Sequence, residues 1–197
     1  MIELWFPTPI YVSEITGDAF SDVQDELTAM YQTDKHNMSK VARWERDTHS
    51  LSDPSFTRNL LHEFKCEKTM SAIGEHVVSY INGMGLDKYE WTIMSSWLTQ
   101  TKQHEFARIH GHGGSDIAGV YYLDTNGEDG NLYFRTPNVL LNQSYMAQHV
   151  PNEYETVPKN GKILLWPAYL DHGTRSNLTE HERVSLSFNI VIRRAWS

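Results

Sequence analysis

The chain has a single cysteine, Cys66, among its 197 residues. One thiol cannot form a disulfide within the chain, and it excludes a zinc site built from several cysteines. Long hydrophobic runs are also missing, since no apolar stretch reaches the roughly 18 residues that a membrane-spanning helix needs. The opening MIELWFPTPIYVSEI contains no basic stretch, and two prolines interrupt its apolar residues, so we expect no secretory signal. These absences favour a protein of a reducing cytoplasm.

The chain also has fewer basic than acidic residues. The 17 lysines and arginines are outnumbered by 25 aspartates and glutamates, which gives a formal net charge of -8. Proteins that bind a phosphate backbone without sequence specificity usually carry the opposite sign. We therefore expect no nucleic-acid partner. The hydrophobic content of 40% suffices for a core, and the length suits one domain over residues 1–197.

The first part of the chain has helical periodicity. Apolar residues recur every three or four positions in residues 19–32 and again in residues 56–81, which predicts two helices. Asp53 and Pro54 stand where the second helix would begin, as N-cap and first helical residue, and Gly83 stands where it would end.

The second part changes to strand periodicity. Strands are predicted at residues 91–98, 106–112, 117–123, 131–135, 162–166 and 183–193. Helices followed by many short strands predict an α+β protein whose β part is a sandwich or a barrel. Residues 1–88 would then form a helical support region for a β core over residues 89–197.

The last predicted strand, RVSLSFNIVIRR, has one apolar and one polar face. The apolar face holds Val184, Leu186, Phe188, Ile190 and Ile192, and the polar face holds Arg183, Ser185, Ser187 and Asn189. Two interpretations are open, because the polar face could line a wet cavity or could be an ordinary solvent face.

Three histidines are the candidate metal ligands in the sequence. His110 and His112 lie two residues apart in RIHGHGG, and in a strand such residues point the same way about 6–7 Å apart. An H-x-H pair also arises by chance, as two polar residues at the end of a sheet. His172, in GKILLWPAYLDHG, would add a third imidazole and leave positions on a metal ion open for water, cosubstrate and oxygen. Arg183, eleven residues later, has a guanidinium suited to bidentate capture of a carboxylate.

These motifs resemble, in order and spacing, the iron(II)/2-oxoglutarate-dependent oxygenases. The most similar branch is a small one, related to the prolyl hydroxylases and found in bacteria and tailed phages. FPTPIY stands near the start, HGH precedes AGVYYL, GKILLWP precedes the distal histidine, and RVSLSFN comes last. The resemblance covers essentially the whole chain, most specifically residues 108–193. It implies a double-stranded β-helix (jelly roll, cupin-like) with the N-terminal helices packed on one sheet.

The resemblance also implies an activity and its residues. His110, His112 and His172 would bind Fe(2+), and Arg183 would pair with the distal carboxylate of 2-oxoglutarate. Helper hydroxyls for that carboxylate would come from Tyr122 and Ser185. The enzyme would use 2-oxoglutarate and O2 to hydroxylate a peptidyl side chain or a small molecule, with release of succinate and CO2.

One departure from the family pattern leaves two points open, the third metal ligand and the identity of the metal ion. Relatives use H-x-D or H-x-E, and this chain has His112 where they have the carboxylate. Asp116 is an alternative ligand if the Gly113-Gly114 turn folds back. Three neutral imidazoles leave the ion its full +2 charge, and zinc bound by three histidines is also chemically reasonable.

Two other functions compete with this one. A three-histidine, cupin-like metalloenzyme that needs no 2-oxoglutarate would leave Arg183 unexplained. A non-catalytic jelly-roll protein, serving in binding or in a virion, would keep the metal site as a relic. The sequence does not name a substrate. The apolar N-terminal segment is a candidate contact for a homodimer, and a phage-encoded protein would work in the host cytoplasm.

Overall fold

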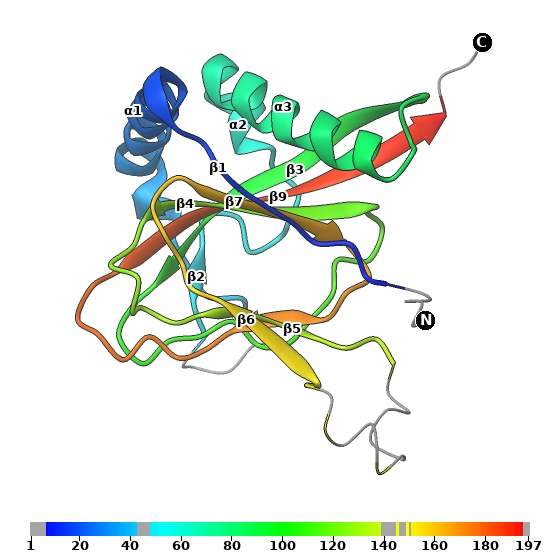
Figure 1. Ribbon diagram of the computed structural model, residues 1–197. Coiled ribbons are helices and arrows are strands. Elements are labelled where there is room, and N and C mark those ends of the chain that lie inside the picture. The colour runs from blue at the N-terminus through cyan, green and yellow to red at the C-terminus, as the bar shows by residue number, and fades with distance from the viewer. Residues whose placement is uncertain (1–6, 43–47, 139–144, 146–148, 150, 195–197) are drawn as a thin grey trace.

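The structure is a computed structural model that describes residues 7–42, 48–138, 145, 149 and 151–194 (Figure 1). Part of the segment considered for a homodimer contact, residues 1–6, lies outside the described residues. The helices are α1 (Gly17–Asp34), the 3-10 turn η1 (Lys35–Asn37), α2 (Leu60–Glu63) and α3 (Glu67–Gly83). The strands are β1 (Tyr11–Glu14), β2 (Ser50–Leu51), β3 (Tyr89–Thr101), β4 (Ile117–Asp124), β5 (Leu132–Arg135), β6 (Glu153–Thr156), β7 (Lys162–Pro167), β8 (His172–Thr174) and β9 (Arg183–Arg194).

The strands form two antiparallel sheets. The major sheet has the order β1-β7-β4-β9-β3-β2, and the minor sheet has the order β6-β5-β8. In Figure 1, α1 and α3 lie over one face of the major sheet, and the minor sheet lies on its other side. The α+β architecture with helices packed on one sheet is therefore confirmed. No helix in the described part of the chain is long and apolar enough to cross a membrane.

The helix layer is held by the apolar stripes that the sequence predicts. Helix α1 buries Val23, Leu27 and Met30. Helix α3 buries Ile73 and Val77, among others. These side chains join the apolar face of β9 in one continuous core cluster. The opposite, polar face of β9 is thereby directed between the two sheets.

The second helix begins later than the sequence predicts. Asp53 does not cap a helix, because its carboxylate accepts hydrogen bonds from the amides of Ser55 (3.1 Å) and Arg58 (2.7 Å) and closes a turn. Phe56, inside this turn, has a φ of 58°, and Lys65, between α2 and α3, has a φ of 53°. Neither value is helical, so the predicted helix is divided into a loop, the short α2 and α3.

The polar face of β9 lines the space between the sheets. Arg183, Ser185 and Asn189 are 2%, 5% and 9% exposed. A solvent face would show far larger values, so the cavity interpretation is correct. Strand pairing extends this face into rows across the major sheet, and the rows are Ser95–Asn189–Ala118–Trp166, Trp97–Ser187–Val120–Leu164 and Thr99–Ser185–Tyr122.

Candidate metal centre

The three histidines meet where a loop crosses the start of the minor sheet. His110 and His112 lie between β3 and β4, and His172 begins β8. Residues 106–112 do not form the regular strand predicted. Instead, His110 and His172 form an isolated antiparallel bridge with two reciprocal backbone hydrogen bonds of 2.9 Å each. The amide of His112 donates to the carbonyl of Ala168 at 2.8 Å. Backbone contacts thus fix all three positions.

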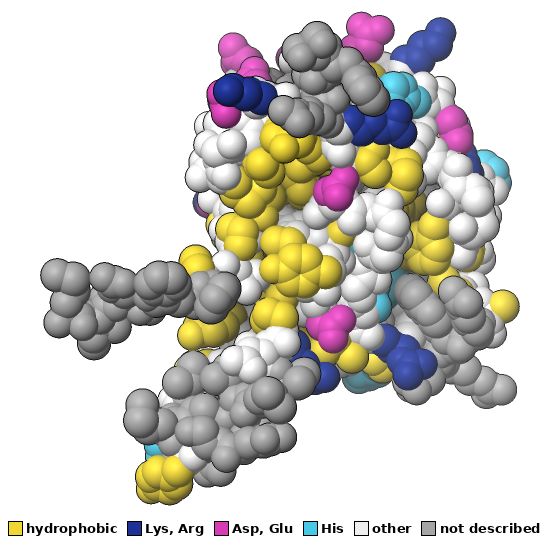
Figure 2. Space-filling view, turned by 90° about the vertical axis from the view of Figure 1, so that its right-hand side faces the viewer, with side chains coloured by type: hydrophobic (Ala, Val, Ile, Leu, Met, Phe, Trp, Pro, Cys, Tyr) yellow, Lys and Arg dark blue, Asp and Glu magenta, His cyan; other side chains and the backbone are white. Residues whose placement is uncertain are grey.

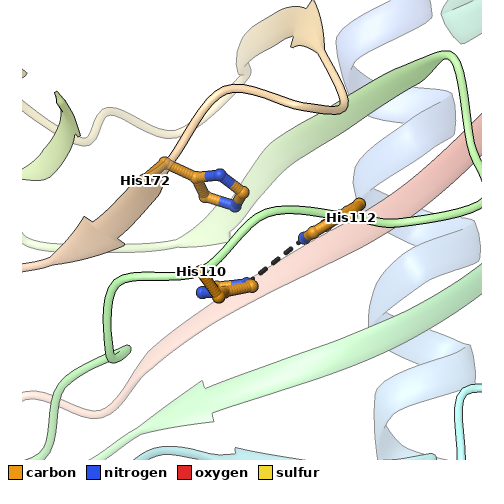
Figure 3. Close-up of side chains that lie close together, drawn as sticks. All are labelled: His110, His112 and His172. Carbon is orange, nitrogen blue, oxygen red and sulfur yellow. Dashed lines mark hydrogen bonds between the residues drawn. The ribbon is translucent and has the colours of Figure 1, made fainter. Parts of the chain in front are cut away.

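The three rings turn toward a common point (Figure 3). Ring centroids are separated by 4.4 Å for His110 and His172, 4.9 Å for His112 and His172, and 5.2 Å for His110 and His112. One nitrogen from each ring lies within 4.8 Å of the other two, and the Nε2 atoms of His110 and His112 are 3.2 Å apart. This arrangement can hold one cation.

The other ring nitrogens decide which atoms face the centre. Nδ1 of His110 lies 2.6 Å from the carbonyl of Arg108, and Nδ1 of His172 lies 2.9 Å from the carbonyl of Leu170. Nδ1 of His112 lies 2.6 Å from the side-chain oxygen of Asn189. Each acceptor requires a proton on Nδ1, so each neutral ring keeps a lone pair on Nε2. Three lone pairs facing one point repel each other unless a cation lies between them, and this donor set fits a divalent metal.

Burial keeps these rings neutral. Desolvation lowers the pKa of His112 to about 4, against an upward effect of the hydrogen bond to Asn189. Desolvation also lowers the pKa values of His110 and His172. Neutral imidazoles are the form that binds metal ions.

The alternative ligand Asp116 lies outside this group. Its carboxylate accepts a hydrogen bond of 2.6 Å from the amide of Ile192, near the end of β9. The described residues that can share one ion are His110, His112 and His172. The structure therefore brings together the three histidines of the sequence prediction and leaves the rival carboxylate aside.

Arg183 lies in the same cavity, which has a volume of about 70 Å³ and is lined by all three histidines. Its Nη1 donates to the carbonyls of Asp129 (2.8 Å) and Gly130, and its Nη2 donates to the Thr101 hydroxyl at 3.2 Å. The wholly buried Asp129 carboxylate is 3.8 Å from Nη1 and balances the charge. These three hydrogen bonds leave donors to spare, because a guanidinium carries five N–H groups.

Tyr122 and Ser185 are neighbours across β4 and β9, and both line the cavity with Arg183. Desolvation raises the pKa of Tyr122 to about 12, so its hydroxyl is protonated at neutral pH and can donate a hydrogen bond. The three residues predicted to bind one carboxylate therefore lie on one wall.

Other residues of the site have weak or no sequence signals. Asn189 stands on the predicted polar face, but nothing in the sequence shows that it contacts His112. His49 also lines the cavity and is 5% exposed, but it directly precedes the two-residue strand β2, which has no periodicity to mark it. Asp129 and Thr101, which hold Arg183, belong to a turn and a strand end without any motif.

Residues 95–189 match a protein family described as "Putative 2OG-Fe(II) oxygenase". No curated protein matches the chain. Among solved structures, the chain is similar to a Pseudomonas putida prolyl-4-hydroxylase, with 14% identity, a TM-score of 0.60 and 92% of each chain covered.

Two further structures cover nearly the whole chain. HygX from Streptomyces hygroscopicus, solved with nickel and 2-oxoglutarate, has 14% identity and a TM-score of 0.62 over 93% of this chain and 83% of HygX. A prolyl hydroxylase from Trichoplax adhaerens, solved with a hypoxia inducible factor peptide, has 12% identity and a TM-score of 0.63 over 92% of this chain and 83% of the other. At these identities the likeness shows the fold, and it confirms the predicted double-stranded β-helix.

Proposed function

We propose that the chain is a 2-oxoglutarate-dependent dioxygenase that hydroxylates a peptide or a small molecule, and the match of residues 95–189 to the 2OG-Fe(II) oxygenase family supports this proposal. The observation that carries the proposal is the cavity itself. Three imidazole lone pairs converge at one wall, and a buried arginine with unused donors occupies another.

We propose that His110, His112 and His172 hold iron(II) through their Nε2 atoms. Three neutral ligands add no charge, so the ion keeps its +2 charge and attracts a dianionic cosubstrate. The three histidines would hold the ion at the wall of the cavity that they line, and the cavity would give cosubstrate and substrate access to it. Iron(II) with 2-oxoglutarate and O2 supplies an oxidation that yields succinate and CO2 and delivers an oxygen atom to the substrate.

We propose that Arg183, Tyr122 and Ser185 bind the distal carboxylate of 2-oxoglutarate. The guanidinium supplies charge and the two hydroxyls supply directed donors, which together fix the orientation of the cosubstrate. Asp129 and Thr101 hold the guanidinium in place. A three-histidine enzyme that needs no 2-oxoglutarate would have no use for this buried charge, and neither would a non-catalytic jelly roll.

Two aromatic residues form the wall beside His112. The ring of Trp97 is 5.9 Å from that of His112, and Phe56 packs edge-on against Trp97 at 5.3 Å. Both line the cavity, so they exclude water from the metal end.

Two similar structures support a peptide or a small molecule as the substrate. The Trichoplax adhaerens enzyme was solved with a peptide and HygX with hygromycin B, so this fold accommodates both kinds of molecule. On the face shown in Figure 2, hydrophobic side chains form a band and the lysines and arginines are scattered. Together with the net charge of -8 this supports a partner other than nucleic acid.

Four broader predictions accompany the function. We infer one domain over residues 1–197, with residues 1–88 supporting the core of residues 89–197, because β1 and β2 of the first region pair with β7 and β3 of the second. A cytoplasmic location and a homodimer stay predictions from the sequence. The iron preference over zinc is inferred from the family.

Metal binding is tested by substitution of single ligands. His112→Ala and His172→Ala should each lower iron(II) affinity by at least about tenfold, because each removes one of three ligands. Asp116→Ala is the matched control and should bind iron(II) as the wild type does. Anaerobic competition with a chromophoric chelator measures all of these affinities. Loss of iron in Asp116→Ala, with retention in His112→Ala, would show that Asp116 and not His112 is the third ligand.

Cosubstrate binding is tested by removing one hydroxyl. Tyr122→Phe should weaken 2-oxoglutarate binding to the iron-loaded protein without changing iron affinity. Tyr121→Phe is the control, because its hydroxyl faces the helices and accepts a hydrogen bond from Gln24 at 3.1 Å. Anaerobic titration calorimetry gives both constants. Iron binding without any 2-oxoglutarate binding in the wild type would favour the cupin-like alternative, and binding of neither would favour the non-catalytic one.

A further inference from the structure

Trp166 is an aromatic residue of the cavity with one polar group, its indole N–H, and the proposed function gives it no role. It lies on β7, is 2% exposed and lines the cavity together with His172. Its ring centroid is 4.8 Å from that of His172, with the ring planes at 66°. The indole Nε1 is buried and has no hydrogen-bond partner among the described residues. Buried N–H groups nearly always have an acceptor, so this one points to an acceptor supplied by a ligand.

The register of the major sheet places Trp166 at the metal end of the cavity. Trp166 pairs with Ala118, and Ala118 pairs with Asn189, which accepts the hydrogen bond from His112. Arg183 lies six residues along β9 from Asn189 and pairs with Thr101, so it lies at the other end of the cavity.

Hydrogen-bond donors are scarce at this end. The three histidines direct their Nδ1–H groups away from the centre, toward Arg108, Leu170 and Asn189. An anion bound at the cation would therefore meet lone pairs and apolar walls on this side. A carboxylate that binds a metal through one oxygen has a second oxygen that is stabilised by an N–H donor, most strongly in a site without bulk water.

We propose that Trp166 is a cosubstrate-binding residue whose indole N–H donates to the carboxylate of 2-oxoglutarate next to the metal ion. The inference rests on the proposed function, since it needs a 2-oxo acid in this cavity. It divides the recognition of the two carboxylates between opposite ends of the cavity. Arg183 binds the distal carboxylate, and Trp166 binds the proximal one.

The test removes the N–H group in two ways. Trp166→Phe keeps an aromatic ring without the donor. Site-specific replacement of Trp166 by β-benzothienylalanine keeps the shape of the indole and exchanges only the N–H for sulfur, so a packing defect does not obscure the result. Trp91→Phe is the matched control, because Trp91 lies on the other face of the sheet against Gly74 of α3.

Three quantities are measured without oxygen: iron(II) affinity, the dissociation constant of 2-oxoglutarate for the iron-loaded protein, and its visible charge-transfer absorption. Both Trp166 variants should raise the dissociation constant about tenfold or more, as expected for a lost hydrogen bond to a charged group. The absorption maximum should move, and iron affinity should stay unchanged. The control should match the wild type in all three.

Two results would overturn the inference alone. One is an unchanged dissociation constant in both variants, and the other is a parallel loss of iron affinity, which would mean that Trp166 only packs against His172. A wild-type protein that binds iron(II) but no 2-oxoglutarate would instead remove the proposed function, and this inference with it.

Discussion

At the residue scale, the histidines of the centre are oriented in two different ways. His110 and His172 each direct Nδ1 to the carbonyl two residues before them, so their own segments orient them. His112 depends on a distant side chain, Asn189, whose amide nitrogen in turn donates to the Ser95 hydroxyl at 3.2 Å. The orientation of His112 is therefore the one that a single substitution elsewhere can change.

We expect Asn189→Leu to lower the metal affinity of the protein about 10- to 100-fold, because the ring of His112 loses the acceptor that fixes its proton and its direction. Asn189→Asp should retain the affinity of the wild type or exceed it, since a carboxylate accepts the same hydrogen bond more strongly. Competition with a chromophoric chelator measures the affinities, and Asn131→Leu is the control, because the half-buried Asn131 donates its side-chain hydrogen bond to Glu155 and not to a histidine. Equal affinities in Asn189→Leu and the wild type would show that His112 needs no such support.

At the element scale, the long amphipathic elements could be predicted and the short ones could not. The apolar stripe of α1 and the alternation of β9 arise from burial of one face, which the sequence records directly. Strands β6 and β8 have four and three residues and are specified by their long-range partners. The histidine pair was predicted as a metal site from strand periodicity in residues 106–112. The structure brings this pair together with His172, but a backbone bridge to β8 positions it, and local periodicity cannot reveal such a bridge.

The packing of β4 against the core leads to a prediction about stability. A Cβ atom on Gly119 would lie 2.3 Å from the ring of Phe188 and 2.8 Å from the side chain of Leu165. Both neighbours are wholly buried and cannot move away. Gly119→Ala should therefore lower the free energy of unfolding by about 1–3 kcal/mol.

The matched control for this substitution is Gly83→Ala at the end of α3, where an added Cβ meets nothing within 4 Å. It should leave the free energy of unfolding unchanged or raise it by up to about 1 kcal/mol, because alanine favours the helix. Chemical denaturation of both variants measures the difference. A Gly119→Ala protein as stable as Gly83→Ala would mean that the core around β4 rearranges freely.

At the scale of the whole molecule, the space between the sheets is lined with polar groups that folding removes from water. His49 is an example at the edge of this space, and desolvation lowers its pKa to about 4 from its ordinary value of 6.5. The unfolded chain therefore binds more protons than the folded protein between these two pH values. The resulting contribution to stability is fully present above about pH 6.5 and falls as the pH decreases toward about 4.

We expect the free energy of unfolding of the metal-free protein to decrease as the pH is lowered through this range. His49→Gln should have a shallower slope, by at most about 1.4 kcal/mol per pH unit. Urea denaturation at a series of pH values, with a chelator present, measures both slopes. Parallel curves for the two proteins would show that His49 takes no part in acid sensitivity.

The backbone bridge between His110 and His172 has a consequence for handling the protein. Reciprocal amide–carbonyl contacts join these two ligands without help from an ion. A chelator should thus strip the centre and leave the surrounding polypeptide folded, and a different divalent ion can be loaded afterwards. One metal-free preparation can then be divided and loaded with different ions without refolding. Differences in activity between the samples would come from the ion that was added.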